Sequence, residues 1–419
     1  MFNMKNARAL CLPNILYWIL IFYMFFNEIL TKSIFENITI LKYLIILYLF
    51  FYIIHRTKYS AKNIYSKPLK VFYVYIVIIS ILTISNWAFT LSGIGAYKNL
   101  LILPLSIYIF SFYENITGKS RDDLMTLIVK MAVAHVLINT FLYFYEIPIW
   151  KVFHPYWGRI SQGYPTVDVV LLNFSLAILL IYKGLKFKTL IKILFAFILV
   201  IGILLLASGT GIVMMTIVFA LSILIPILQK RYVKKIKTTI VTLILLLISF
   251  SSAVQIIKNV DESLYESMYL SLQNRMSILL GQESELDINT MDIRKERRSD
   301  IKKMQTDDFD VLFGRGFSNL NMNPEIRNVP GTIFLEDQYS VNLLTIGVIG
   351  ALMFLVCFAI EAIKAIKQKR ELIAVIILLF IISSFTSGCL INFSISLFVG
   401  IFLQRPQISM YEYKLKQKN

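Results

Sequence analysis

The sequence predicts an all-α polytopic membrane protein with about twelve transmembrane helices, both termini in the cytoplasm and one long outer loop. Hydrophobic residues make up 57% of the 419 residues, charged residues only 16%, and the mean hydropathy is +0.70. A soluble globular domain has roughly 45–50% apolar and about 25% charged residues. The apolar residues also gather in runs close to the ~20 residues that a helix needs to cross a bilayer. These observations exclude an ordinary soluble enzyme, a disordered chain and a disulfide scaffold.

Each apolar run is expected to form a helix, because backbone that crosses lipid must satisfy its own hydrogen bonds. The first run follows Lys5 and Arg8 and has no clear cleavage site, which predicts an uncleaved anchor rather than a signal peptide. The predicted spans are 11–30, 38–55, 69–86, 96–113, 123–146, 166–183, 187–207, 210–228, 237–256, 338–363, 371–386 and 388–403.

Lys and Arg residues near the ends of the spans predict the orientation, because cytoplasmic loops are enriched in both. With the N-terminus in the cytoplasm, every inner segment is basic, and this alternation holds over all the spans. It also accounts for the net charge of +17, so no nucleic-acid partner is needed. The short outer loops hold only Lys32, Lys98, Lys151 and Arg159.

The chain is expected to have three parts. Residues 1–256 form a membrane domain of nine helices, 257–337 form a large periplasmic or extracellular loop, and 338–419 add three helices and a cytoplasmic tail. The large loop contains two stretches with amphipathic helical patterns, 261–280 and 291–305. The second has basic residues on one face and acidic residues on the other, which is also typical of a solvated, salt-bridged helix.

Two further features of the sequence lie near the end of this loop. Gly314 and Gly316 flank Arg315, and such a pair permits a tight turn and a close approach of the backbone to a ligand. Glu336 and Asp337 stand where the chain re-enters the membrane, so they are candidates either for chemistry or for capping the helix that follows. Beyond them, Gly347 and Gly350 are expected to permit close contact between helices.

Polar residues inside the spans and the histidines complete the candidate list. His135 and Asn139 lie four residues apart in the fifth span, which predicts hydrogen bonding between helices or, alternatively, a functional site. His55, His135 and His154 have no metal-ligand spacing, so neither a metal nor another cofactor is expected.

Three segments resemble the Wzy-type polysaccharide polymerases and the related O-antigen ligases. "WGRISQGYP" (157–165) resembles the Arg-Gly loop of that family, and "ERRSDIKKMQTDDFDVLFGRGFSNL" (296–320) resembles its pattern of Arg, amphipathic stretch and Gly-x-Gly turn. "EDQYSVNLLTIGVIG" (336–350) is similar to its polar start of a helix that ends in Gly-x-x-Gly. The topology match covers the whole chain, whereas the motif match covers about 160–350.

The sequence also departs from the family pattern in two places. Gly209 stands where family members often have Arg, which removes one expected pyrophosphate contact. Ligases usually have His near the re-entry helix, where this chain has Glu336, Asp337 and Gln338. The second departure favours a polymerase over a ligase.

The resemblance implies a glycosyltransferase of the bacterial inner membrane that polymerises undecaprenyl-pyrophosphate-linked repeat units into O-antigen or capsular polysaccharide. A chain-length regulator and a flippase are the implied protein partners. Asp337 and then Glu336 are the implied catalytic base. Arginine grips phosphate bidentately, so the candidate pyrophosphate ligands are Arg159, Arg298 and Arg315, followed by Arg297, Arg294 and Arg275.

Two alternatives stay open. An O-antigen ligase performs the same chemistry with another acceptor. A lipid-linked oligosaccharide flippase or another carrier also fits about twelve spans, but carriers typically place ionisable residues deep in several spans. Here the charged residues of the spans, such as Lys42 and Asp168, lie near the span ends, which favours the enzyme.

Overall fold

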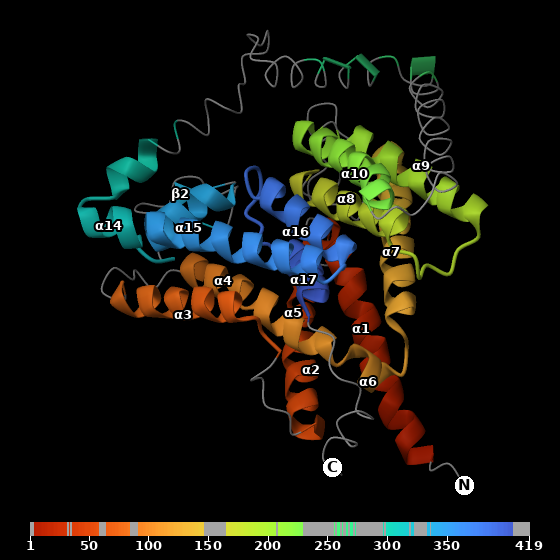
Figure 1. The fold of residues 1–419 in the computed structure, drawn as a ribbon, viewed down its shortest axis with the longest axis horizontal. Helices are drawn as coiled ribbons and strands as arrows, with labels where there is room; N and C mark the ends of the chain where they lie inside the picture. The colour runs from red at the N-terminus through yellow and green to blue at the C-terminus, as the bar shows by residue number, and fades with distance from the viewer. Residues whose placement is uncertain are drawn as a thin grey trace.

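The computed structural model describes residues 4–31, 33, 36–57, 64–83, 91–145, 165–206, 208–228, 299–317, 320–321, 333–335 and 337–404, with single positions between 255 and 296. These residues are almost entirely helical (Figure 1). The described strands are β1 (Leu320–Asn321) and β2 (Ile333–Phe334), which pair in parallel with Leu320 opposite Ile333.

Every predicted span contains a helix, apart from 237–256, of which only position 255 is among the described residues. Four helical stretches are long and apolar enough to cross a membrane: Asn37–His55, Arg121–Tyr143, Gly209–Pro226 and Gln338–Lys367. The chain is therefore a helical protein of membrane type, and the full count of crossings stays a prediction.

The N-terminal helices are α1 (Met4–Thr31), η1 (Glu36–Ile40), α2 (Leu41–Thr57), α3 (Lys67–Leu82), α4 (Leu91–Leu100), α5 (Ile102–Ser111), α6 (Tyr113–Thr117) and α7 (Arg121–Phe144). The later helices are α8 (Pro165–Ile181), α9 (Thr189–Leu205), α10 (Gly209–Leu228), α14 (Asp308–Phe313), α15 (Gln338–Lys367), α16 (Glu371–Ser383) and α17 (Phe393–Leu403).

The predicted span 96–113 contains one apolar helical stretch, Tyr97–Ser111, which is assigned as α4 and α5 because one turn is irregular at Leu101. Pro104 has no N–H to donate to the carbonyl of Leu100, four residues earlier. The hydroxyl of Tyr73 donates to that carbonyl instead, at 3.3 Å. A side chain of α3 thus satisfies the carbonyl that the proline leaves unpaired.

The joint between the last two predicted spans is also longer than expected. The helix α16 ends at Ser383 and α17 begins at Phe393, so a turn occupies 384–392. Asn392 caps α17, because its side chain accepts the N–H of Ile395 at 3.1 Å. At ~1.5 Å per residue, α17 is too short to cross a ~30 Å hydrocarbon core by itself.

The middle of the molecule is built around α8 and α17, which are buried on nearly all sides. The helix α8 packs against α7, α9, α10, α16 and α17. Gly211 permits the close approach of α10, since a Cβ there would lie 2.2 Å from the side chain of Val169. Asn173 joins the same helices by donating to the carbonyls of Val169 and Gly211. Helices that are apolar all round are expected at such a position.

The long helix α15 is broken at Gly347, whose φ of 68° is non-helical. A helix end leaves its last four carbonyls without partners. Here the carbonyls of 343–346 all find partners from other segments: Leu343 accepts from Gln305, Leu344 from the N–H of Arg315, Thr345 from the N–H of Gly316, and Ile346 from the hydroxyl of Tyr75. The first part of α15 is thus a complete helix with a C-terminal end made by the tertiary fold.

Tyr75 is inserted directly into the break. Its hydroxyl donates to the carbonyl of Ile346 at 3.0 Å. In an unbroken helix the N–H of residue 350 would bind the carbonyl of residue 346. The side chain from α3 therefore replaces one helical hydrogen bond, which is a recognised cause of sharp kinks.

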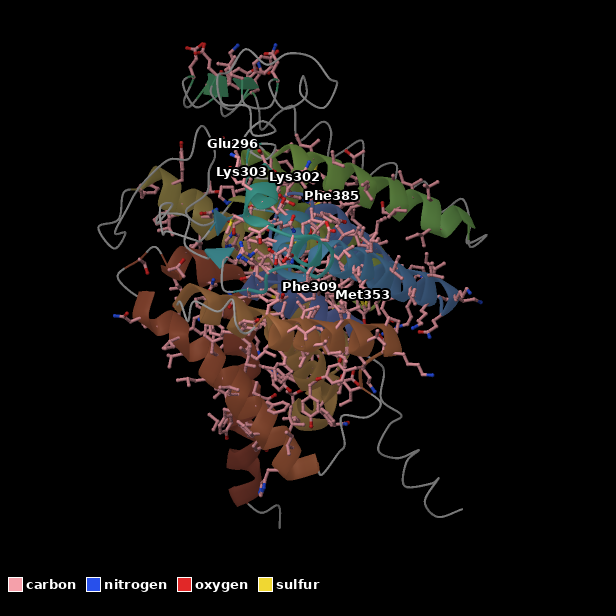
Figure 2. All side chains as sticks on the ribbon, turned by 90° about the vertical axis from the view of Figure 1, so that its left-hand side faces the viewer. Glu296, Lys302, Lys303, Phe309, Met353 and Phe385 are labelled. Atoms are coloured by element: carbon pink, nitrogen blue, oxygen red, sulfur yellow. The ribbon has the colours of Figure 1, made fainter. Side chains whose placement is uncertain are left out.

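The end of the long loop docks on this break. Gly314 and Gly316 have positive φ of 82° and 77°, and a Cβ at Gly314 would lie 2.4 Å from the backbone of Thr345. The glycine pair does permit a close approach, but the backbone that approaches is that of α15 rather than a ligand. Figure 2 faces this segment, with Lys302 and Lys303 high in the view and Phe309 and Met353 lower.

Candidate functional site

Asp337 caps α15 in the structure. One carboxylate oxygen accepts the N–H of Ser340 at 2.8 Å, and the other accepts its hydroxyl at 2.7 Å. The residue is only 3% exposed. Both oxygens are therefore engaged in the cap that acidic residues ordinarily supply at a helix N-terminus. This geometry supports the capping alternative rather than a base, and Glu336 lies outside the described residues.

Gln338 continues this polar end of α15 into the turn at 384–392. Its N–H donates to the carbonyls of Ser384 and Ser387, and its side chain accepts the N–H of Leu390 at 2.8 Å. The same side chain donates to Asn342 at 2.8 Å, and both residues are buried. Gln338, which stands where ligases are expected to have histidine, thus fixes the turn between α16 and α17 against α15.

Arg315 is held by its own segment. Its Nε lies 3.4 Å from a carboxylate oxygen of Asp310, and its Nη1 donates to the carbonyl of Met304. Asp310 is fixed in turn, because it accepts from both the N–H and the hydroxyl of Thr306. The structure therefore gives Arg315 a role in shaping the loop that docks on α15. The other predicted pyrophosphate ligands, Arg159, Arg275, Arg294, Arg297 and Arg298, lie outside the described residues.

A group of residues that the sequence interpretation did not select lies where α1, α2, α4 and α17 meet. We call it the lysine cluster, and it consists of Asn27, Lys42, Tyr43, Lys98, Asn99 and Phe393. The ammonium group of Lys42 lies 5.0 Å from the ring centre of Tyr43, and that of Lys98 lies 4.1 Å from the same centre. The two positive charges are consequently within about 9 Å of each other.

The lysine cluster is fixed by neutral groups. The side chain of Asn27 accepts from Lys42, and the hydroxyl of Tyr43 donates to the side chain of Asn99 at 2.7 Å. The ring of Phe393, the first residue of α17, packs edge-on against Tyr43 at 5.7 Å and lies 4.6 Å from the ammonium group of Lys42. Aromatic faces attract cations, so these rings help to position both lysines.

The burial of the two lysines differs. Lys42 is 5% exposed, and its ammonium group donates to the side chain of Asn27. Lys98 is exposed, and the part of the chain that the structure describes offers it no carboxylate partner. A ligand with several negative charges can bind the exposed ammonium group of Lys98 and the neighbouring ammonium group of Lys42 together. The sequence contains one signal for this cluster. Lys42 and Lys98 lie at the predicted outer ends of their spans, whereas Lys and Arg are expected mainly in the cytoplasmic loops.

A second buried polar group joins α7 to α8. Nε2 of His135 lies 3.3 Å from a carboxylate oxygen of Asp168, and both side chains are at most 2% exposed. The rings of Phe25 and Phe26 in α1 pack against the imidazole at 6.4 and 5.5 Å between centres. The polar patch predicted around His135 therefore includes a carboxylate from the next helix, which the i, i+4 pattern with Asn139 could not reveal.

Comparison with models of known protein families gives no match, and no curated protein matches the sequence significantly.

Proposed function

We propose that this protein is a Wzy-type polymerase, a membrane glycosyltransferase that joins glycan repeat units carried on undecaprenyl pyrophosphate. In this proposal Lys42 and Lys98 bind the pyrophosphate of the donor. The observation that carries the proposal is the lysine cluster, because two cations on one aromatic ring suit a ligand with two adjacent phosphates. The three motif resemblances and the membrane-type helices support the same class.

The proposed orientation places the lysine cluster at the outer face of the bacterial inner membrane. Contacts between helix ends support it, because they join segments that the Lys and Arg pattern assigns to the same side. Gln338 meets Leu390 between two predicted outer segments. Lys186 meets Asp123, and Arg370 meets Gln404, between predicted inner ones. A misassigned span between the two members of such a pair would reverse one of them and produce a contact between opposite sides.

The proposed reaction is a transfer of the growing glycan. A hydroxyl oxygen of the acceptor sugar forms a bond to the anomeric carbon of the donor, and the bond from that carbon to the phosphate oxygen breaks. The hydroxyl proton is released, and undecaprenyl pyrophosphate leaves with the bonding electrons. Negative charge thus grows on the leaving phosphate, where fixed positive groups stabilise the transition state most effectively. The buried ammonium group of Lys42 is well suited to this role, since little water screens it.

Deletion of the gene tests the class of function. The polymerase proposal predicts surface glycan with single repeat units in place of long chains, as read on a glycan gel. Complete loss of even single units would contradict it and would indicate a flippase or a ligase.

Replacement of the lysines tests the site. Lys42→Ala or Lys98→Ala should each shorten the polymer by lowering the rate about 10²-fold, the effect of removing one well-placed donor to developing charge. Lys302→Ala, at an exposed position of the long loop, is the matched control and should leave the ladder unchanged. Normal ladders from both cluster variants at normal membrane levels would remove the lysine cluster from the site.

The flippase is a second candidate, because the pair of His135 and Asp168 is an ionisable group buried between helices. Such groups mark proton or substrate pathways in carriers. Transport of lipid-linked glycan by the purified protein in vesicles separates the two candidates. The polymerase should lengthen glycan supplied on the lysine-cluster side without moving it across the bilayer.

A further inference from the structure

An open groove runs along the outside of α1, on the opposite side of the membrane from the lysine cluster in the proposed orientation. Its volume is about 640 Å³, and it is lined by Asn14, Ile15, Trp18, Ile19, Phe22, Lys119 and Met131. The α1 residues follow one another at helical spacing, so they form one continuous face. Met131 comes from α7, and Lys119 comes from the turn between α6 and α7. The groove thus has an apolar wall and a positive group.

The length of the groove suits one leaflet of a bilayer. From Asn14 to Phe22 the helix rises about 12 Å at ~1.5 Å per residue, which is somewhat less than half of a ~30 Å hydrocarbon core. Lys119 precedes the first residue of α7, whereas Met131 lies ten residues into it. The positive group therefore stands at the surface end of the groove, and the apolar lining continues toward the middle of the membrane.

The charge at the surface end is available to an anion. The ammonium group of Lys119 lies 5.5 Å from the ring centre of Trp18, and the described residues give it no carboxylate partner. The acidic residues nearby are engaged elsewhere: Asp123 with Lys186, Asp122 with Tyr182, and Glu114 with the N–H of Arg121. The fold thus leaves a positive charge beside an aromatic ring at the head of an apolar groove.

We infer that this groove binds a single anionic phospholipid of the cytoplasmic leaflet, with its phosphate at Lys119 and one acyl chain along Ile15, Trp18 and Phe22. The anionic headgroup is matched by Lys119, because anionic lipids bind basic residues at the cytoplasmic surface. The acyl chain is matched by the apolar side chains that line the groove. A protein helix would fill the apolar wall but would leave the charge of Lys119 unmatched. The inference is independent of the proposed enzymatic activity.

Quenching of Trp18 fluorescence tests the site in the full-length protein. The protein is placed in vesicles of phosphatidylcholine that contain a small fraction of either brominated phosphatidylglycerol or brominated phosphatidylcholine. The signal of Trp18 is the difference between the unchanged protein and the Trp18→Phe variant. Brominated phosphatidylglycerol should occupy the groove roughly fivefold more than brominated phosphatidylcholine, a factor that corresponds to about 1 kcal/mol for one lysine near an anionic surface.

Charge reversal distinguishes a specific site from a general basic surface. Lys119→Glu should abolish the headgroup preference while Trp18 is still quenched. Lys188→Glu, an exposed lysine between α8 and α9 with the same change of charge, should leave the preference intact. Equal quenching by the two brominated lipids, or a preference lost equally in both variants, would overturn the inference. So would an unquenched Trp18, which would mean that another protein segment or a second copy fills the groove.

Discussion

At the scale of single residues, the structure separates residues that shape the fold from lysines that gather at one aromatic ring. Asp337 and Arg315 were candidates because of their residue type and position, but their polar atoms are used within the protein. Lys42 and Lys98 looked like isolated lysines at span ends, yet they meet on one tyrosine ring. A residue type indicates which chemistry is possible, whereas its neighbours decide whether the group is still available.

Substitutions at Asp337 distinguish capping from catalysis. Asn and Asp are about equally good N-cap residues, whereas Ala loses about 1 kcal/mol. We therefore expect Asp337→Asn to keep both the thermal stability and the polymer ladder, and Asp337→Ala to lower the melting temperature in detergent. A stable Asp337→Asn protein without polymer would instead return the carboxylate to the role of base.

The buried pair of His135 and Asp168 should matter for stability. Removing the imidazole takes away one polar partner of the buried Asp168 carboxylate, and the loss of a partner from a buried polar group typically costs about 1–3 kcal/mol. We expect His135→Leu to destabilise the protein strongly, and His135→Leu combined with Asp168→Leu to recover much of the loss. Melting temperatures of the two single variants and the double variant measure the coupling, and additive losses would show that the two side chains act independently.

At the scale of elements, the broken helix α15 is the feature that organises the outer part of the molecule. Its break exposes four carbonyls, and two segments, 299–317 and α3, supply the donors. The segment that follows Asp307 is thereby attached to the membrane helices and is not left as a free loop. Broken helices within membranes are tolerated only where protein or water satisfies the freed backbone groups, and here protein does so.

Alanine substitutions at two glycines with similar φ test this arrangement. Gly118 (φ 66°, ψ 6°) is in the left-handed helical region, where alanine costs roughly 1–2 kcal/mol, whereas Gly347 (φ 68°, ψ −173°) is in a region essentially restricted to glycine, so alanine strains the backbone more there. A Cβ at Gly118 meets nothing, whereas one at Gly347 would lie 2.3 Å from the carbonyl oxygen of Leu312. We expect Gly347→Ala to release the docked segment and to make 299–317 sensitive to protease. Equal protease sensitivity of both variants would show that the close packing is unimportant.

At the scale of the whole molecule, the fold gives the two faces different chemistry. The proposed outer face holds the lysine cluster and the polar end of α15, whereas the proposed inner face carries the basic segments and the groove at Lys119. This division follows from alternating helices, because the two ends of every span lie on opposite sides.

Accessibility labelling tests the division. Single cysteines at positions 160 and 290 should react with an impermeant reagent from outside, and cysteines at 62, 186 and 234 only after permeabilisation. The native Cys11, Cys357 and Cys389 are first replaced by Ala or Ser, although Cys357 and Cys389 are buried. A cytoplasmic position 290 would invert the proposed site and contradict the polymerase proposal.

The sequence by itself determined the membrane class, the positions of most helices and the orientation proposed for them. Hydrophobic run length and the placement of Lys and Arg are local properties, and the bilayer acts on each run separately. The tertiary structure alone decided that α15 breaks at Gly347 and that Lys42 meets Lys98. Each of these depends on a partner far along the chain. Tyr75, for example, stands 271 residues from the carbonyl that it binds, and no local pattern encodes such a distance.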